Sequence, residues 1–513
     1  MIKNNNIIIK SDCIFPATGE NAFDGYLKIK DGIIASIGKG EVPSGLIDND
    51  TEIFDLKGKT VSPGFSDVHC FFTGYVVRFL GCDLKDCKDE NEVLTKAKEY
   101  MKEIPDNYPV LGHDLSINIS EEKLNEEFGT RPVILFVTGC ETCAMNTNAI
   151  ETYNFNPNRC WPEAYVKIFP FILGNKEFIK PQFVDYMKMM NSHGITSIKE
   201  MGFDDFYSFT DVLKELEQED ALTLRVNFMS QPVDKPANFE YGEKMRDLFK
   251  GEFVRFSGYN QMTDGSVSEY CADIKKPYNN TDTCCKQNIN WQKLADDTRE
   301  ADKRGFRFSL HAQGDAAIAK TLDIYDTCKK DENGKMVNRH AITDLEFSDP
   351  IDLERMGKMG VIAEIYPQIQ SIANRKDKLA MIEEKIGLER GKNYWNRRKM
   401  ADSGVTISCG TDLPLLIDNI PESIYHAVGG FFPEGGEPFN PDNMLTREEL
   451  LKAWTYGGAY NLQNEKELGT LEIGKKADIA VLSKNIFEEP LETIRDVKVC
   501  MTLVNGNIVY KGE

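Results

Sequence analysis

The chain lacks the features that mark nucleic-acid-binding, membrane-spanning and secreted proteins. It has 61 Lys and Arg residues against 82 Asp and Glu, a net charge of −21, so it has no basic excess for phosphate backbones or anionic lipids. No apolar run approaches the roughly 20 residues of a membrane helix, and the polar stretch after Met1 is too short for a secretion signal. We therefore expect a cytoplasmic protein with no nucleic-acid or membrane partner.

A second pair of cysteines with the two-residue CxxC spacing is also missing, although Cys284 and Cys285 are adjacent. The chain has 13 cysteines, and Cys140 and Cys143 have the two-residue spacing of a zinc or redox motif. A zinc ribbon needs another such pair at a suitable distance, and the sequence offers none. In a reducing cytoplasm we expect the cysteines to be free thiols.

The length of 513 residues predicts one large domain with a smaller companion, and an apolar fraction of 41% is enough for a real core. Both ends are rich in short β-type runs, such as Tyr26–Lys30 and Val499–Val504, and Asn505 and Gly506 form a strong hairpin turn signal. Neither end could bury its apolar face alone. We therefore expect a small composite β-sandwich domain built from residues 1–62 and 468–513.

The middle of the chain alternates between apolar strand-like runs and amphipathic helices. Runs such as Ile195–Ile198 and Val361–Ile365 predict buried strands, and Pro181 favours a helix that begins there and ends at Ser192. Strands that alternate with helices pair in parallel. The sequence thus predicts an α/β fold, a (β/α)8 TIM barrel over residues 63–467 with an insertion around residues 72–170.

Seven short motifs along this chain carry a family resemblance. They are PGFSDVH at 63–69, GITS at 194–197, YNQMTDGS at 259–266, HAQGDAA at 311–317, RHAITD at 339–344, CGTD at 409–412 and LGTLEIGKKAD at 468–478. In content and order they resemble the amidohydrolase superfamily, in the branch of YtcJ-like amidohydrolases. The resemblance covers essentially the whole chain and implies a TIM barrel, although a fold does not fix a reaction.

The resemblance implies a metal site at the carboxyl ends of the barrel strands, and this chain keeps only half of it. The six expected ligand positions fall on His69, Phe71, Asn260, His311, Asp344 and Asp412. Phe71, Asn260 and Asp344 replace the family's His, Lys and His. A bridged two-metal centre is not expected, because a phenyl ring offers no lone pair and an Asn side chain cannot be carboxylated.

One metal ion remains compatible with the residues that are left. His69, His311, Asp344 and Asp412 would offer two imidazoles and two carboxylates, an acceptable set for Zn, Fe or Mn. The alternative is that no metal is bound and that the two histidines form structural hydrogen bonds. The resemblance assigns proton transfer in the reaction to Asp412, and His311 is the second candidate catalytic residue.

Five residues are candidates for the substrate side of the site: Phe71, His113, Cys140, Glu163 and Asn260. Phe71 and Asn260 stand at former ligand positions, and the other three fall where relatives have segments near the substrate. A simpler interpretation stays open for His113, as an ordinary loop residue, and for Cys140, as an inert buried thiol.

Three functions are compatible with this altered site. Our working hypothesis is hydrolysis of a non-peptide carbon–nitrogen bond in a small-molecule amide or cyclic amide, at a mononuclear or otherwise altered metal site. The alternatives are metal-independent lyase, hydratase or isomerase chemistry, and ligand binding without turnover. Lys199 and Glu200 either place charge in the barrel mouth or lie in a solvated loop. A homodimer is the expected assembly for this class.

Overall fold

The computed structural model describes residues 6–138, 142–154, 156–159, 164, 167–202, 208–232, 236–416 and 420–512. The chain forms two compact units. The larger unit comprises Met1–Cys70, Tyr186–Asp204 and Glu217–Glu513, and the smaller one Phe71–Asp185 and Asp205–Leu216. In the described part of the chain, no helix has both the length and the apolar character needed to cross a membrane.

The larger unit contains a barrel of eight parallel strands. They are β6 (Phe65–Cys70), β11 (Ile195–Gly202), β12 (Arg225–Ser230), β13 (Val254–Met262), β14 (Phe308–Ala312), β15 (Ala341–Asp344), β16 (Ile362–Ile365) and β17 (Ile407–Cys409). Each strand pairs with the next one along the chain. The first and eighth strands meet where the N–H of Asp412 donates to the carbonyl of His69 at 2.8 Å. The predicted (β/α)8 TIM barrel is confirmed.

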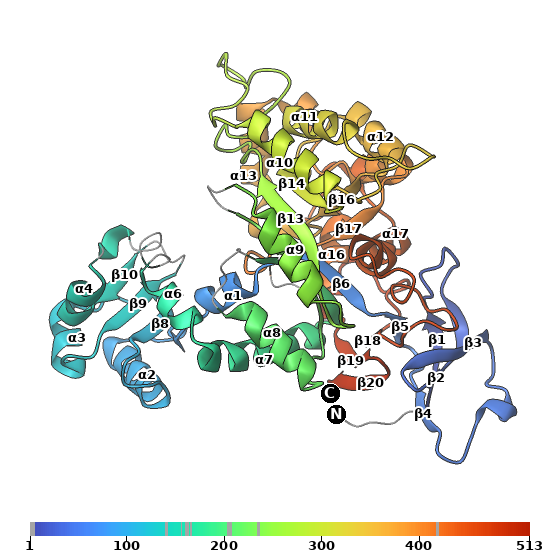
Figure 1. Ribbon diagram of the computed structural model, residues 1–513, viewed down its shortest axis with the longest axis horizontal. Coiled ribbons are helices and arrows are strands. Elements are labelled where there is room, and N and C mark those ends of the chain that lie inside the picture. The colour runs from blue at the N-terminus through green and yellow to red at the C-terminus, as the bar shows by residue number, and fades with distance from the viewer. Residues whose placement is uncertain are drawn as a thin grey trace. The chain divides into compact units, whose positions relative to one another are not determined.

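Helices follow the barrel strands in the connections between them (Figure 1). They are α9 (Phe239–Leu248), α10 (Trp291–Lys303), α11 (Asp315–Asp326), α12 (Pro350–Met359), α13 (Arg375–Lys385), α14 (Leu388–Gly391), α15 (Arg397–Asp402), α16 (Ile420–Ala427), α17 (Arg447–Lys452) and α18 (Gly458–Asn461). Side-chain caps fix where several of them begin. The side chain of Asn290 accepts from the N–H of Lys293 at the start of α10, and Thr446 and Glu449 form a capping box at α17.

The two ends of the chain form one eight-stranded sheet, in agreement with the predicted pairing of the termini. The strands are β1 (Asn6–Ile14), β2 (Phe23–Lys30), β3 (Ile33–Lys39), β4 (Glu52–Asp55), β5 (Thr60–Pro63), β18 (Ile479–Leu482), β19 (Val499–Val504) and β20 (Asn507–Lys511). Strand β5 pairs in parallel with β1 and antiparallel with β18, and Figure 1 shows the red C-terminal strands beside β5. Buried Arg225 of β12 binds Asp478 at 2.9 Å, which ties this sheet to the barrel. The domain boundaries given above stay a prediction.

The smaller unit is built on a four-stranded sheet with the order β10-β9-β8-β7. Its strands are β7 (Cys82–Asp83), β8 (Val110–Leu115), β9 (Val133–Val137) and β10 (Cys143–Met145). Its helices are α1 (Phe72–Arg78), α2 (Glu90–Glu103), α3 (Glu121–Phe128), α4 (Thr147–Tyr153) and α6 (Phe169–Leu173), with most of α8 (Phe209–Gln218). Buried side chains from α2, α3, β8 and β9 form its apolar core.

One predicted helix start is wrong. Helix α7 spans Lys176–Ser192, so Pro181 lies inside it and not at its first position. A proline this close to a helix start removes only one backbone hydrogen bond. Two lysines of the added turns, Lys176 and Lys180, both bind the carboxylate of Glu215, and these charge-assisted hydrogen bonds stabilise the earlier start.

Candidate functional site

Four of the predicted site residues lie at the carboxyl ends of barrel strands in the larger unit. His69 lies near the end of β6, His311 in β14, Asp344 at the end of β15, and Asp412 just after β17. In TIM barrels this is the end that carries the active site. The four side chains form two pairs, each of one histidine and one aspartate.

The first pair joins the first and eighth strands. His69 Nε2 lies 3.5 Å from Asp412 Oδ1, and the imidazole is buried while the Asp412 side chain is 26% exposed. The carboxylate of Asp67 holds this junction, because it accepts from the N–H of His69 at 3.1 Å and from the hydroxyl of Thr411 at 2.5 Å. Gly410 is needed here, since a Cβ at that position would lie only 2.7 Å from the Cβ of His69.

The second pair joins the fifth and sixth strands. His311 Nε2 lies 3.2 Å from Asp344 Oδ2. The segment after His311 is held by the buried carboxylate of Asp264, which accepts from the N–H groups of Gln313 and Gly314, each at 2.9 Å. The hydroxyl of Thr263 donates to the carbonyl of His311 at 2.8 Å. These bonds fix the direction in which the imidazole leaves the strand.

Both aspartates have a left-handed backbone. The φ angle is +80° at Asp344 and +53° at Asp412. Residues other than glycine rarely adopt this conformation, and where they do, it often marks a functional site. This backbone conformation occurs at both positions where an aspartate approaches its histidine, Asp344 at 3.2 Å and Asp412 at 3.5 Å.

Burial and the neighbouring charges shift the pKa of the proton-carrying groups. Burial raises the pKa of Asp412 above its usual value, although the imidazoles of His69 and His311 oppose this rise. Burial alone would lower the pKa of His311, but the carboxylates of Asp344, Asp264 and Asp412 outweigh it and raise that pKa. A carboxylate with a raised pKa is a stronger base, and an imidazole with a raised pKa keeps its proton over a wider pH range, so the two groups are suited to proton transfer.

A buried ion pair lies behind His69, and its acid was not predicted from the sequence. Glu364 of β16 and Lys199 of β11 are both fully buried and bind each other across the barrel interior. Burial alone would raise the pKa of Glu364, but the charges of Lys199, His69 and Arg307 hold it below its ordinary value. Glu364 Oε2 lies 3.8 Å from His69 Nδ1, so the imidazole stands between two carboxylates, those of Glu364 and Asp412.

The four donors, as they are arranged, do not fit a single metal ion. Two ligands of one tetrahedral ion lie about 3.3 Å apart, so each His–Asp pair alone has a suitable spacing. A metal site needs at least three donors that converge. Within the described residues, only one group of three has all its donor atoms within 4.8 Å of one another, and that group contains none of these four residues.

A model of the amidohydrolase family matches residues 52–127 and 179–510. The chain belongs to this family. The matched segments contain both His–Asp pairs, which confirms the family resemblance carried by the motifs. Phe71, Asn260 and Asp344, the positions where we expect replaced ligands, also lie within the matched segments.

Two relatives match along almost their whole length. The chain is 22% identical to the YtcJ protein of Bacillus subtilis (strain 168), over 94% of this chain and 95% of the other. It is also 22% identical to N-substituted formamide deformylase of Arthrobacter pascens, over 100% and 99%. Among solved structures, an uncharacterized metal-dependent hydrolase from Pyrococcus horikoshii matches with a TM-score of 0.73, 21% identity and coverage of 95% and 99%. At this identity the structural match shows the fold.

The three converging donors lie elsewhere in the barrel and are already hydrogen-bonded. They are Asp302, Cys328 and His340. His340 lies just before β15, where its Nδ1 accepts from the N–H of Phe308 at 3.0 Å and its Nε2 therefore donates to Asp302, also at 3.0 Å. A metal at Nε2 would need the other tautomer, which would set two N–H groups against each other. We interpret this cluster as structural.

The substrate-side candidates belong to both units. In the larger unit, Asn260 of β13 is buried and its amide donates to Gln231 Oε1 at 3.1 Å. In the smaller unit, Phe71 caps the start of α1, and His113 of β8 binds Asp114 at 3.1 Å. Cys140 and Glu163 lie outside the described residues. The structure therefore brings together the four residues at the strand ends. The role of the five other candidates in substrate binding stays a prediction.

Lys199 and Glu200 do not lie in a solvated loop. Strand β11 continues through both residues to Gly202, and each side chain is fully buried. The sequence signal for Glu364 was a single acid in the apolar run Val361–Ile365, since a carboxylate in a buried strand must find a cation. The cation is Lys199, 165 residues earlier in the chain.

Proposed function

We propose that this protein hydrolyses a non-peptide carbon–nitrogen bond in an amide or cyclic amide of a small molecule. The observation that carries the proposal is the pair of His–Asp contacts, 3.5 Å and 3.2 Å, at the end of the barrel where substrates bind in this fold. Support also comes from a relative, matched over 99% of its length, that is named N-substituted formamide deformylase.

One residue of each pair takes part in hydrolysis, Asp412 as the base and His311 as the acid. Asp412 takes a proton from a water molecule while the water oxygen bonds to the carbonyl carbon. The carbon–nitrogen bond then breaks, and the protonated imidazole of His311 gives its proton to the leaving nitrogen. The products are a carboxylic acid and an amine, and the proton on Asp412 restores His311 for the next turnover.

The remaining polar residues hold these two groups in place. Asp344 stabilises the protonated form of His311 through their 3.2 Å contact. His69 lies between Glu364 and Asp412 and limits the positions that the Asp412 carboxylate can adopt. Proton transfer depends on such alignment, because a misplacement of about 1 Å can lower a rate 100-fold.

The test is substitution at the proposed base, assayed with a panel of formamides, linear amides and cyclic amides. Asp412→Asn should lower kcat/KM by about 100- to 10,000-fold, the usual contribution of a general base. Asp442→Asn, at an exposed aspartate, is the matched control and should change nothing. Full turnover by Asp412→Asn would remove the basis of the proposal.

Elemental analysis decides whether a metal takes part. One solved structure that resembles this chain is named a metal-dependent hydrolase. A first outcome is that protein purified without added metal holds about one Zn, Fe or Mn per chain, which His311→Ala loses. That result would mean that side chains of the two pairs move together in solution and bind one ion. If no metal is found even after reconstitution, the acid–base route stands alone.

A further inference from the structure

A buried arginine without an anionic partner lies at the carboxyl end of the sixth and seventh barrel strands. Arg397, the first residue of α15, is 2% exposed. Its Nη1 donates to Gln370 Oε1 at 3.4 Å, while its Nη2 is buried and has no hydrogen-bond partner among the described residues. No carboxylate in the described ranges lies within 4.0 Å of this guanidinium, and burial lowers its pKa to about 10. Such a buried, uncompensated cation is costly.

Two more buried donors share this situation. Trp395 Nε1 and the hydroxyl of Tyr366 have no hydrogen-bond partner within the described part of the chain, and these side chains are 5% and 4% exposed. An indole N–H can only donate, and a guanidinium has no acceptor at all. Three unused donors, one of them cationic, therefore occur together. Buried donors of this kind are nearly always paired in folded proteins.

Arg397, Trp395 and Tyr366 line one pocket together with Asp344. The space inside is about 10 Å³, which is close to the room that a single water molecule or one carboxylate oxygen needs. Asp344 does not fill it, because its carboxylate is engaged with His311 at 3.2 Å. The ring of Tyr366 contacts the ring of His69 at 5.5 Å between centroids, so the pocket adjoins both His–Asp pairs.

We propose that Arg397, Trp395 and Tyr366 form an anion-binding subsite that receives a carboxylate group of the substrate. One carboxylate oxygen fits the available space, accepts from the three donors and neutralises the guanidinium. A neutral amide or hydroxyl group would leave the buried charge uncompensated. This inference rests on the proposed function, which supplies the substrate, and narrows it to amides that carry a carboxylate near the bond to be cleaved.

Binding of acetate to the full-length protein tests the subsite without turnover. Isothermal titration compares sodium acetate with acetamide, its neutral counterpart, and with sodium chloride, all at equal ionic strength. We expect saturable binding of acetate and much weaker binding of acetamide and chloride. Arg397→Met should weaken acetate binding at least tenfold. This variant should fold, because it removes an uncompensated buried charge.

Arg398→Met is the matched control at the next residue of α15. Arg398 binds Asp402 at 2.9 Å and Glu449 at 2.6 Å and does not line the pocket, so its loss should leave acetate binding unchanged. A second variant, Tyr366→Phe, keeps the ring and removes only the hydroxyl. It should weaken acetate binding several-fold, and circular dichroism should show an unchanged fold.

Three results would overturn the subsite: no saturable acetate binding to the wild-type protein, equal binding of acetate and either acetamide or chloride, or unchanged acetate binding by Arg397→Met. The measurement does not depend on hydrolysis. Failure of the proposed function would leave acetate binding intact, and failure of the subsite would leave turnover of uncharged amides intact. The two outcomes can therefore be told apart.

Discussion

Breaking the Lys199–Glu364 pair should destabilise the barrel strongly. Both side chains are fully buried, and Lys199→Met would leave the carboxylate of Glu364 inside the barrel without its cation. Loss of one partner of a buried ion pair costs about 3–5 kcal/mol. Glu364 would keep hydrogen bonds from Thr343, at 2.7 Å, and Asn461, at 3.0 Å, so we expect the lower end, about 3 kcal/mol.

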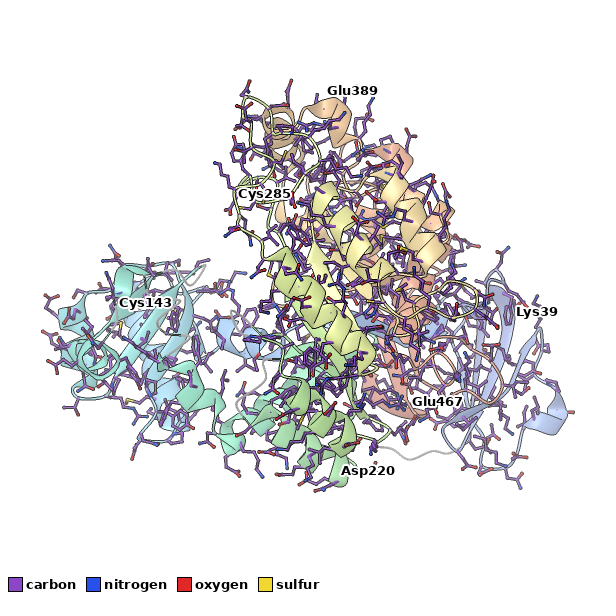
Figure 2. All side chains as sticks on the ribbon, turned by 45° about the horizontal axis from the view of Figure 1, so that its top comes forward. Lys39, Cys143, Asp220, Cys285, Glu389 and Glu467 are labelled. Carbon is purple, nitrogen blue, oxygen red and sulfur yellow. The ribbon has the colours of Figure 1, made fainter. Side chains whose placement is uncertain are left out.

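The double variant Lys199→Met/Glu364→Gln isolates the charge effect. It removes both charges and leaves a polar amide that can still accept from Thr343. We expect it to recover at least half of the lost unfolding free energy, because replacing both members of a buried ion pair by neutral residues often changes stability little. Lys392→Met is the matched control, since Lys392 binds exposed Glu389, labelled in Figure 2, at 2.8 Å on the surface. It should cost less than about 1 kcal/mol.

Urea unfolding followed by tryptophan fluorescence is a suitable assay. Three of the four tryptophans, at positions 291, 395 and 454, belong to the larger unit, so the signal reports mainly on the barrel. A loss of stability in Lys199→Met as small as that in Lys392→Met would contradict this expectation. A double variant less stable than Lys199→Met alone would also contradict it, because the cost would then come from lost packing and not from an unpaired charge.

Three further predictions concern the carboxylate behind His311, the hydrogen-bonded histidine cluster and the glycine beside His69. Burial raises the pKa of Asp264 to about 6, so between pH 4 and 6 the folded protein binds more protons than the unfolded chain. Its contribution to the unfolding free energy should therefore fall as pH rises through that range, by up to about 3 kcal/mol, and Asp264→Asn should make the pH profile measured in urea less steep. His340→Leu should lower the unfolding free energy by about 2–3 kcal/mol, because it leaves the N–H of Phe308 without an acceptor. Neither zinc nor a chelator should change the stability of the wild-type protein through this cluster. A zinc-dependent gain in stability that His340→Leu abolishes would show a metal site instead. Gly410→Ala should keep the fold but lower turnover at least tenfold, because the new Cβ would lie 2.7 Å from the Cβ of His69; wild-type turnover would mean that the position of His69 does not matter.

The barrel and the residues of the two His–Asp pairs could be predicted from the sequence, because each depends on local motifs. The motif HAQGDAA places His311 at a strand end, and CGTD does the same for Asp412. That Asp344 contacts His311 follows from the adjacency of β14 and β15 in the parallel sheet. Consecutive strands of a TIM barrel are neighbours, so order along the chain becomes order in space.

The partners of Glu364 and Arg397 could not be read from the sequence in the same way. Glu364 is recognisable as a single acid within an apolar strand, but its cation comes from the opposite side of the barrel. Arg397 and Arg398 are neighbours in the chain and differ in burial. Arg398 pairs with carboxylates near the surface, whereas Arg397 is buried without any. Such differences depend on tertiary packing and not on local pattern.

The joining of β5 to β18 has a consequence for biosynthesis. Thr60 of β5 pairs with Leu482 of β18. During synthesis on the ribosome, β5 therefore has no β18 to pair with until nearly the whole chain has been made. At about 5–20 residues per second, this delay lasts roughly 20–80 s. During it, an apolar strand edge of the nascent chain is open to wrong partners. Expression yield in cells, and its dependence on chaperones, should therefore respond more to substitutions in β18 and β5 than the activity of the purified enzyme does.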